Sequence, residues 1–286
     1  MKYINRLGEI VDKPDAMNRF LKKIYANRTG RFLMKQLCNR PVSELTGRFL
    51  DSGFSRILIQ PFSKNNGIDS SLYENRKFRS FNDFFTRKSS PHVRRFSENP
   101  RDFCAPCDGK LTVVPLSESS TFEVKGSTYT VESLLRYRKL ADRLAGGQAL
   151  IFRLSPDNFH RYSYFDAAKK SRNYHISGRY YSVDPAVVER VPVYKENERE
   201  FTILETENFG TCIYMEVGAM MVGKIVNHYG DTVVRRGEEK GYFAFGGSTI
   251  IVLLQKNAVQ LLEEYTDAEY EVEVRMGDVL GAAPAE

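Results

Sequence analysis

Apolar side chains recur at helical spacing over roughly residues 1–60. The members of one stripe fall at i, i+3, i+4, i+7 and i+8 and so share a helix face: Met17, Phe20, Leu21, Ile24 and Tyr25. Basic residues lie off that stripe: Arg19, Lys22, Lys23 and Arg28. A basic amphipathic helix either packs on its own domain, which is the commoner fate, or lies on an anionic membrane. Helical spacing recurs at residues 43–59 and in the aromatic segment 78–85, which has the character of a docking element.

From about residue 100 the pattern changes to short apolar or alternating runs separated by turn residues. These runs predict strands at residues 111–115, 149–154, 201–204, 211–217, 232–234, 249–254 and 270–274. Residues 131–144 have the spacing of a helix between strands. We therefore predict an α+β fold, with a basic helical region over residues 1–100 and a mostly antiparallel, β-rich domain, a sandwich or partly open barrel, over residues 101–286.

The net charge of the chain also changes near residue 100. Residues 1–101 hold 21 basic and 9 acidic side chains, a net +12, whereas residues 102–286 hold 21 basic and 27 acidic side chains, a net −6. A basic segment of this kind favours an anionic partner, either nucleic acid or a membrane surface. Composition alone leaves that choice open.

Several classes of protein are disfavoured by the remaining composition. The mean hydropathy is −0.42, and the longest apolar run, residues 250–254, is far short of the ~20 residues that span a bilayer. The N-terminus lacks the apolar stretch of a secretory signal. Four cysteines in such a chain indicate reduced thiols in the cytosol. Cys104 and Cys107 form a C-x-x-C, but a turn sequence follows directly, so we interpret both thiols as structural.

Three residues are candidates for chemistry. Asp108 precedes Gly109 in a turn sequence, which alone indicates only a turn before a strand. His160 follows a predicted strand and lies in a polar and aromatic cluster, although a single histidine is more often scaffold than catalytic. Ser248 follows Gly246-Gly247 and begins an apolar strand. Those glycines indicate either a bulge or a backbone bend that exposes the Ser248 hydroxyl to the preceding carbonyl.

Together and in this order, the motifs resemble the phosphatidylserine decarboxylase family, whose members are pyruvoyl enzymes made from self-cleaving precursors. The matching stretches are Phe81-Asn82-Asp83-Phe84-Phe85-Thr86-Arg87, Pro106-Cys107-Asp108-Gly109, Asp157-Asn158-Phe159-His160-Arg161, Tyr181-Ser182-Val183-Asp184-Pro185, Asn197-Glu198-Arg199, Val217-Gly218-Ala219-Met220-Met221-Val222-Gly223 and the run from Gly237 to Thr249. They span roughly residues 80–255, and the part of the chain before them carries little family signature.

The resemblance implies a chemistry for the three candidates. Ser248 attacks the Gly247 carbonyl, the chain is cut between Gly247 and Ser248, and Ser248 becomes a covalent pyruvoyl group at the start of an α chain of residues 248–286, beside a β chain of residues 1–247. Asp108 and His160 match the charge relay that activates the serine. The amine of phosphatidylserine then forms a Schiff base with the pyruvoyl group, CO₂ leaves, and His160 reprotonates the α-carbon to give phosphatidylethanolamine. Neither a metal nor pyridoxal phosphate is expected.

One position departs from the family pattern. Many members carry a second histidine three residues after the first, often credited with self-cleavage, and here that position is Ser163. Either His160 serves both cleavage and decarboxylation, which is our interpretation, or another group supplies the base for cleavage. Two other hypotheses stay open: a Ser–His–Asp hydrolase with an intact Ser248, and a non-catalytic membrane-binding homologue.

The resemblance also narrows the choice of anionic partner. Because no groove-reading or base-stacking motif accompanies the basic residues, we expect no nucleic-acid partner. We expect the protein to be peripheral, on the cytoplasmic side of the cell membrane, and to meet phosphatidylserine in anionic membranes. A homodimer is left open.

Overall fold

One large sheet forms the centre of the protein in a computed structural model that describes residues 2–12, 21, 23–38, 40–219, 224–246 and 248–285. The sheet has eleven strands in these ranges, in the order β14-β9-β11-β12-β16-β7-β4-β18-β1-β2, with β10 also paired to β11. Their bounds are β1 Lys2–Ile4, β2 Ile10–Asp12, β4 Gly109–Pro115, β7 Gln148–Leu154, β9 Ala168–Lys170, β10 Tyr174–Ile176, β11 Arg199–Thr206, β12 Thr211–Gly218, β14 Thr232–Val234, β16 Ser248–Leu254 and β18 Val272–Val274. All pairings are antiparallel except that of β1 with β18.

The middle of this sheet is the hydrophobic core. Every residue of β16 is buried, and its neighbours β12 and β7 are buried along nearly their whole length. An apolar run such as Ile250–Leu254 is typical of a strand covered on both faces, because no alternation with polar residues is needed.

Smaller sheets pack around the large one. They are formed by β13 Ile225–Asn227, β15 Glu239–Phe243 and β8 Arg161–Ser163; by β17 Gln260–Leu261, β19 Val279–Ala282 and β3 Asp102–Cys104; and by the hairpin of β5 Thr121–Val124 with β6 Ser127–Thr130. The first of these, β13-β15-β8, positions the candidate site.

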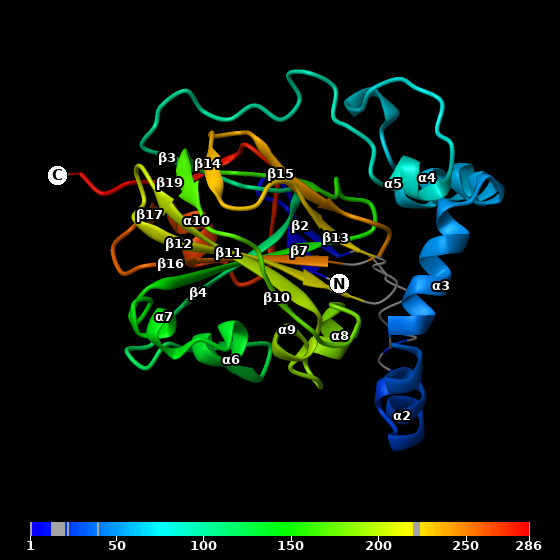
Figure 1. Ribbon diagram of the computed structural model, residues 1–286, viewed down its shortest axis with the longest axis horizontal. Coiled ribbons are helices and arrows are strands. Elements are labelled where there is room, and N and C mark those ends of the chain that lie inside the picture. The colour runs from blue at the N-terminus through cyan, green and yellow to red at the C-terminus, as the bar shows by residue number, and fades with distance from the viewer. Residues whose placement is uncertain are drawn as a thin grey trace.

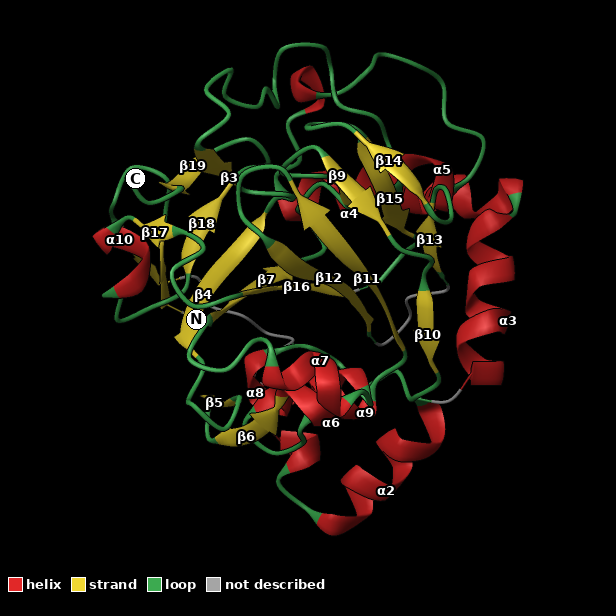
Figure 2. Cartoon of the chain, turned by 60° about the vertical axis from the view of Figure 1, so that its left-hand side comes forward, coloured by secondary structure: helices red, strands yellow, loops and turns green. Residues whose placement is uncertain are grey.

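The helices form two groups. In the N-terminal group are α2 Arg28–Leu37, α3 Arg40–Asp51, the 3-10 helix η1 Gly53–Leu58, α4 Ile59–Asn66, the 3-10 helix η2 Ser70–Leu72 and α5 Phe81–Phe85. Figure 1 shows α2 and α3 along one side of the molecule, with α4 and α5 at their upper end. The second group is α6 Val131–Leu135, α7 Arg138–Asp142, α8 Pro185–Val188 and α9 Val193–Glu196, which lie together below the large sheet (Figure 2), while α10 Glu263–Thr266 lies apart.

The α+β fold with a mostly antiparallel sheet is confirmed, and each of the seven predicted strands is present. The prediction of helix throughout the N-terminal region is wrong at residues 2–12, where β1 and β2 form a hairpin and β1 joins the large sheet beside β18. Local spacing gives no signal for a pairing with a strand near the other end of the chain. The predicted helix at residues 131–144 is two short helices, separated at Arg136, whose φ is +52°. The boundary at residue 100 stays a prediction.

The described part of the first amphipathic stripe packs on its own domain. Leu21 and Tyr25 are each 1% exposed and belong to the main hydrophobic cluster. The other alternative, that this stripe faces a membrane, therefore does not hold for these two residues. Met17, Phe20, Arg19 and Lys22 lie outside the described residues, as do Gly247 and the stretch 220–223 of the family motif.

Candidate functional site

Two of the sequence candidates belong to adjacent parts of one end of the large sheet. Ser248 is the first residue of β16 and is paired with Leu154 on β7 and with Gly218 on β12. Gly109 begins β4, the strand on the other side of β7, and is level with Leu154 and Ser248. Asp108 therefore lies one residue beyond this row, two strands away from Ser248. At about 4.8 Å between neighbouring strands, this separates the two chain segments by roughly 10 Å.

Ser248 is a fully buried serine whose hydroxyl has no hydrogen-bond partner among the described residues. Buried hydroxyls in native proteins are nearly always paired, so an unpaired one calls for an explanation, of which a reactive role is one. The backbone two residues earlier is also unusual, since Gly246 has a φ of +140°. This region favours glycine, so the bend before Ser248 depends on a residue without a Cβ.

His160 lies in the loop between β7 and β8 and is also fully buried. Its Nδ1–H donates a hydrogen bond to the Asn158 carbonyl oxygen at 3.0 Å, whereas Nε2 has no partner in the described part of the chain. Because a carbonyl only accepts, Nδ1 carries the proton and Nε2 presents a lone pair. Burial, and then the positive charge of Arg87, lower the pKa of His160 to about 3, so the imidazole is neutral at physiological pH.

The loop that holds His160 is tied to the segment that delivers Ser248. The backbone N–H of Phe243, the last residue of β15, donates to the His160 carbonyl at 2.9 Å. Four residues then lead from Phe243 to Ser248. The acceptor Nε2 and the donor Oγ–H therefore complement each other chemically at one end of the sheet, and neither has another partner among the residues that the structure describes.

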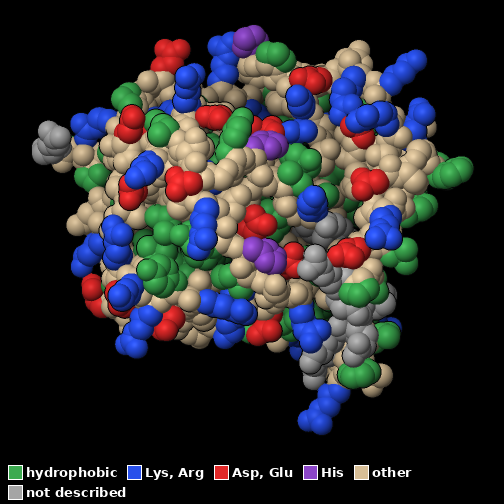
Figure 3. Space-filling model, viewed as in Figure 1, with side chains coloured by type: hydrophobic (Ala, Val, Ile, Leu, Met, Phe, Trp, Pro, Cys, Tyr) green, Lys and Arg blue, Asp and Glu red, His purple; other side chains and the backbone are tan. Residues whose placement is uncertain are grey.

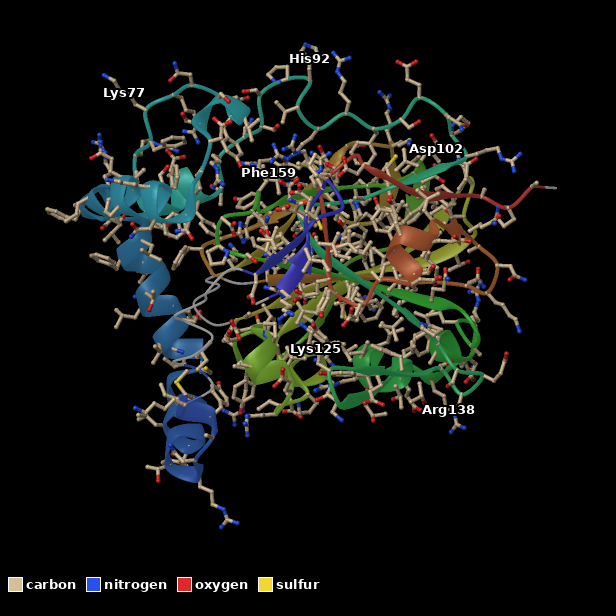
Figure 4. All side chains as sticks on the ribbon, turned by 180° about the vertical axis from the view of Figure 1, so that it is seen from behind. Lys77, His92, Asp102, Lys125, Arg138 and Phe159 are labelled. Atoms are coloured by element: carbon tan, nitrogen blue, oxygen red, sulfur yellow. The ribbon has the colours of Figure 1, made fainter. Side chains whose placement is uncertain are left out.

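Helix α5 covers His160 from outside. The Phe85 ring centroid is 4.1 Å from that of the imidazole, and Phe85 in turn contacts Phe245 at 5.0 Å. Asn82 accepts a hydrogen bond from the Phe245 N–H at 3.0 Å. Figure 4 shows the segment from Lys77 past His92 to Asp102 arching over the sheets, with Phe159 beneath it. The aromatic segment 78–85 is thus a docking element, but its buried residues dock against the site of their own chain.

The role of the Phe81–Arg87 motif was missed by reasoning from the sequence. The motif was evident as a family stretch, yet nothing in its spacing shows that Phe85 packs against His160 or that Asn82 holds the loop before Ser248. The high density of aromatic residues was the available signal. That density does not show which residues the motif contacts.

Asp108 has partners other than His160. Its carboxylate accepts two hydrogen bonds from the Arg94 guanidinium, at 2.9 and 2.7 Å, and a third from the Met276 N–H at 3.0 Å. The hydrogen bond from His160 that a charge relay needs is not among those formed by the described residues, since Nδ1 is directed to Asn158. A relay role for Asp108 stays a prediction.

Ser163, at the position of the family's second histidine, lies at the end of β8. Its backbone N–H donates to the Pro106 carbonyl at 2.9 Å, which holds β8 against the loop that carries Asp108. Both Cys104 and Cys107 are buried and free, and burial raises the pKa of the Cys107 thiol well above its usual range. A raised pKa makes a thiol less reactive, which agrees with a structural role.

A buried ion pair lies between the large sheet and β15, a few residues from Ser248. Lys240 Nζ is 2.7 Å from a Glu216 carboxylate oxygen, and both side chains are fully buried. Asn227 contacts both charged groups, at 2.8 Å to Lys240 and 3.1 Å to Glu216. Burial raises the pKa of Glu216 and lowers that of Lys240.

Within the described ranges, no three His, Cys, Asp or Glu side chains gather in a group that could hold a metal ion. No helix in the same part of the chain is both long and apolar enough to cross a bilayer.

Comparison with known proteins identifies relatives along nearly the whole chain. A family model described as phosphatidylserine decarboxylase matches residues 81–282. Phosphatidylserine decarboxylase proenzyme 2 of Clostridium acetobutylicum is 39% identical over 279 residues, which cover 96% of each chain. The phosphatidylserine decarboxylase proenzyme of Ruminiclostridium cellulolyticum is 37% identical, over 93% of this chain and 92% of the relative.

Proposed function

Because this chain belongs to the phosphatidylserine decarboxylase family, we propose that it decarboxylates phosphatidylserine to phosphatidylethanolamine by means of a pyruvoyl group made from its own Ser248. The observation that carries the proposal is the pair of unpartnered buried atoms, Ser248 Oγ and His160 Nε2, at the same end of the sheet in the described part of the chain. Their chemistry fits self-processing, since one is a hydroxyl donor and the other a basic lone pair.

Self-cleavage begins when Ser248 Oγ bonds to the Gly247 carbonyl carbon while the peptide C–N bond breaks. The hydroxyl proton passes to His160 Nε2, and the departing Ser248 nitrogen takes up a proton to become an amine. Elimination then releases the Gly247 carboxylate and leaves a dehydroalanine. Water converts this residue to a pyruvoyl group and releases one ammonia, so the processing consumes one water in total.

In the mature enzyme, the pyruvoyl group supplies a conjugated carbonyl that accepts the electrons released with CO₂. His160 would move the protons of the reaction. The substrate arrives as an ammonium ion, and Nε2 can take the proton that this amine must lose. The protonated imidazole can then return it to the carbon that has lost CO₂. The aromatic cover of Phe85 and Phe245 would keep water away from this exchange.

The proposed docking surface consists of apolar side chains exposed on the N-terminal helices. They are Phe32 and Leu33 on α2, Leu45 and Phe49 on α3, and Phe54 and Ile57 on η1. Figure 3 shows apolar side chains along the right-hand margin of the molecule, where these helices lie, with Lys and Arg side chains among them. Residues 21–66 contain nine Lys or Arg against two Asp or Glu.

Exposed apolar side chains next to basic ones suit a surface that lies on an anionic lipid bilayer. We therefore propose that the protein is peripheral, on the cytoplasmic side of the cell membrane, where it meets phosphatidylserine. The helices that carry this surface are continuous with the site, because Leu50 of α3 packs in one cluster with Phe81 and Phe85.

Replacement of the serine tests the proposal. Ser248→Ala should stay one chain and release no CO₂ from phosphatidylserine vesicles, while the exposed Ser119→Ala should be cleaved and active like the parent. His160→Ala should lose both activities if one histidine serves both steps. A Ser248→Ala protein that is still cleaved and active would refute the mechanism.

The same experiment separates the other hypotheses. An uncleaved parent with esterase activity would indicate a hydrolase with an intact Ser248. If the uncleaved parent only binds anionic vesicles, it is instead a non-catalytic homologue.

A further inference from the structure

Arg87 is a buried cation that no carboxylate pairs with among the described residues. Its side chain is 1% exposed, and its guanidinium donates to oxygen atoms without formal charge: the Phe85 carbonyl, the Tyr73 hydroxyl, and the Asp157 and Asn158 carbonyls, each at 3.2–3.3 Å. Its Nε has no partner in the same part of the chain. A guanidinium is costly to bury when no carboxylate among the described residues offsets its lost hydration. A buried cation of this kind is therefore expected to have a function that offsets its cost in stability.

The Asn158 carbonyl connects Arg87 to the candidate base. This one oxygen accepts from Arg87 Nη2 at 3.3 Å and from His160 Nδ1–H at 3.0 Å, which together use its two lone pairs. Arg87 thereby holds the acceptor that determines which imidazole nitrogen carries the proton. The positive charge of Arg87 also disfavours a second positive charge on the imidazole.

We propose that Arg87 is a positioning residue that keeps His160 neutral and protonated on Nδ1, so that the Nε2 lone pair is available to the Ser248 hydroxyl. The proposal rests on the proposed function for its chemical meaning. Arg87 touches neither Ser248 nor the scissile bond in any contact of the described residues, and it acts through His160.

Among the groups that the described residues place around His160, Arg87 is the charged one. Helix α5 presents the Phe85 ring, and β15 presents the backbone N–H of Phe243. The histidine's own loop presents the Asn158 carbonyl, while Asp157 contributes its carbonyl to Arg87. Besides burial, which comes first, Arg87 is the group that lowers the pKa of His160, and the bond to Asn158 opposes it.

This arrangement suits a group that must return the proton it takes. An imidazole whose pKa is lowered is a weaker base at rest, but its protonated form is a stronger acid. Once Nε2 has accepted the Ser248 proton, it can therefore pass it rapidly to the departing nitrogen.

The direct test observes the imidazole itself in a precursor that does not react. Ser248→Ala protein carrying ¹⁵N-labelled histidine is titrated by NMR, and the His160 signal is assigned by its loss in His160→Gln. We expect Nδ1–H, with Nε2 unprotonated and no titration above pH 5. Adding Arg87→Gln should raise the titration midpoint by one pH unit or more, whereas Arg87→Lys, which keeps the charge, should leave it low.

A matched control removes a charge from the same segment. Arg76 pairs with Asp83 of α5 at 2.8 Å, so Arg76→Gln should leave the His160 midpoint unchanged. An Nε2–H tautomer in the parent, or an unchanged midpoint in a folded Arg87→Gln protein, would overturn the proposal. Should Arg87→Gln not fold, the parent tautomer and the Arg87→Lys midpoint still decide it.

Self-cleavage gives an independent readout in protein with Ser248 intact. From pH 7 to pH 4, the cleavage rate of Arg87→Gln should fall relative to that of the parent, because more of its imidazole becomes protonated. Parallel pH profiles would contradict the proposal. Failure of the parent to cleave at any pH would refute the proposed function and leave the NMR result standing.

Discussion

The N-terminal helices and the end of the large sheet place their side chains in opposite ways. On η1, Phe54 is 85% exposed and Ile57 is 75% exposed. At the sheet end, Ser248, His160, Glu216 and Lys240 are all fully buried. One region leaves apolar groups outside and the other brings polar groups inside, so each does what folding stability alone disfavours.

The two costs have different explanations. An exposed apolar surface is typical of a protein that meets a lipid or another protein, and its cost disappears when that partner binds. A buried polar group is costly at all times, unless partners satisfy it, and is expected where it performs chemistry. The contrast therefore assigns docking to the helices and reaction to the sheet end. Mutations in either region test this contrast.

The largest effect on stability is expected from the buried ion pair. Glu216→Ala would leave Lys240 buried without its counter-ion and should lower the free energy of unfolding by about 3–5 kcal/mol. The exposed pair of Lys256 with Glu118 provides the control, since Glu118→Ala should cost less than about 1 kcal/mol. Urea unfolding of both variants measures the difference. Equal losses would mean that burial of the first pair has no energetic consequence.

A somewhat smaller effect, about 3 kcal/mol between pH 6 and pH 4, is expected from the titration of His160. The unfolded chain binds a proton on this residue below about pH 6.5, whereas the folded chain resists it down to about pH 3, so stability is complete above pH 6.5 and is lost as the pH falls. The loss is about 1.4 kcal/mol per pH unit within that window. His160→Gln should remove this part of the acid sensitivity.

Unfolding of the uncleaved Ser248→Ala protein at several pH values, with and without His160→Gln, provides the measurement. If both proteins lose stability with the same slope between pH 6 and pH 4, the imidazole is not held neutral. A second histidine, His92, is exposed in a loop and offers the matched replacement His92→Gln, expected to leave the slope as it is.

The smallest effect on stability, and a specific effect on docking, is expected from the exposed helices. Phe54→Ser with Ile57→Ser should change the free energy of unfolding by about 0.5 kcal/mol or less at each site, because both side chains already face solvent. Binding to phosphatidylserine vesicles should weaken by about tenfold or more, at roughly 1.5–3 kcal/mol for each side chain that would be buried in lipid. Vesicle co-sedimentation measures it.

An exposed apolar pair elsewhere provides the control for non-specific binding to vesicles. Val233 and Tyr229 are 75% and 58% exposed on and near the sheet edge β14, and their replacement by Ser should leave vesicle binding unchanged. Equal binding by the Phe54/Ile57 variant and the parent would place the docking surface elsewhere.

Much of the fold could be predicted because its signals are local. The run at residues 250–254 specifies a buried strand, and Gly246 marks a bend before it. The hairpin at residues 2–12 was not predictable in the same way, since β1 is held by β18 near the other end of the chain. Neither helical spacing nor strand alternation carries information about such long-range pairing.

The same limit applies to the candidate site, where local signals identify residues but not their partners. Ser248 and His160 could be identified from residue type and family pattern, and both prove to be buried, with no partner at the reactive atom among the described residues. The partners around them could not. Arg94 holds Asp108, and Arg87 reaches the distant His160 loop, because three-dimensional contacts and not spacing decide where a long cationic side chain finds acceptors.

The mass of the purified, intact protein tests the central claim most directly. We predict two chains, one of residues 1–247 and one of residues 248–286, with the smaller chain lacking one NH₃ relative to a peptide that begins with serine. That deficit distinguishes a pyruvoyl end from simple hydrolysis of the bond. A single chain of 32.8 kDa, or a small chain that begins with an unchanged serine, would contradict it.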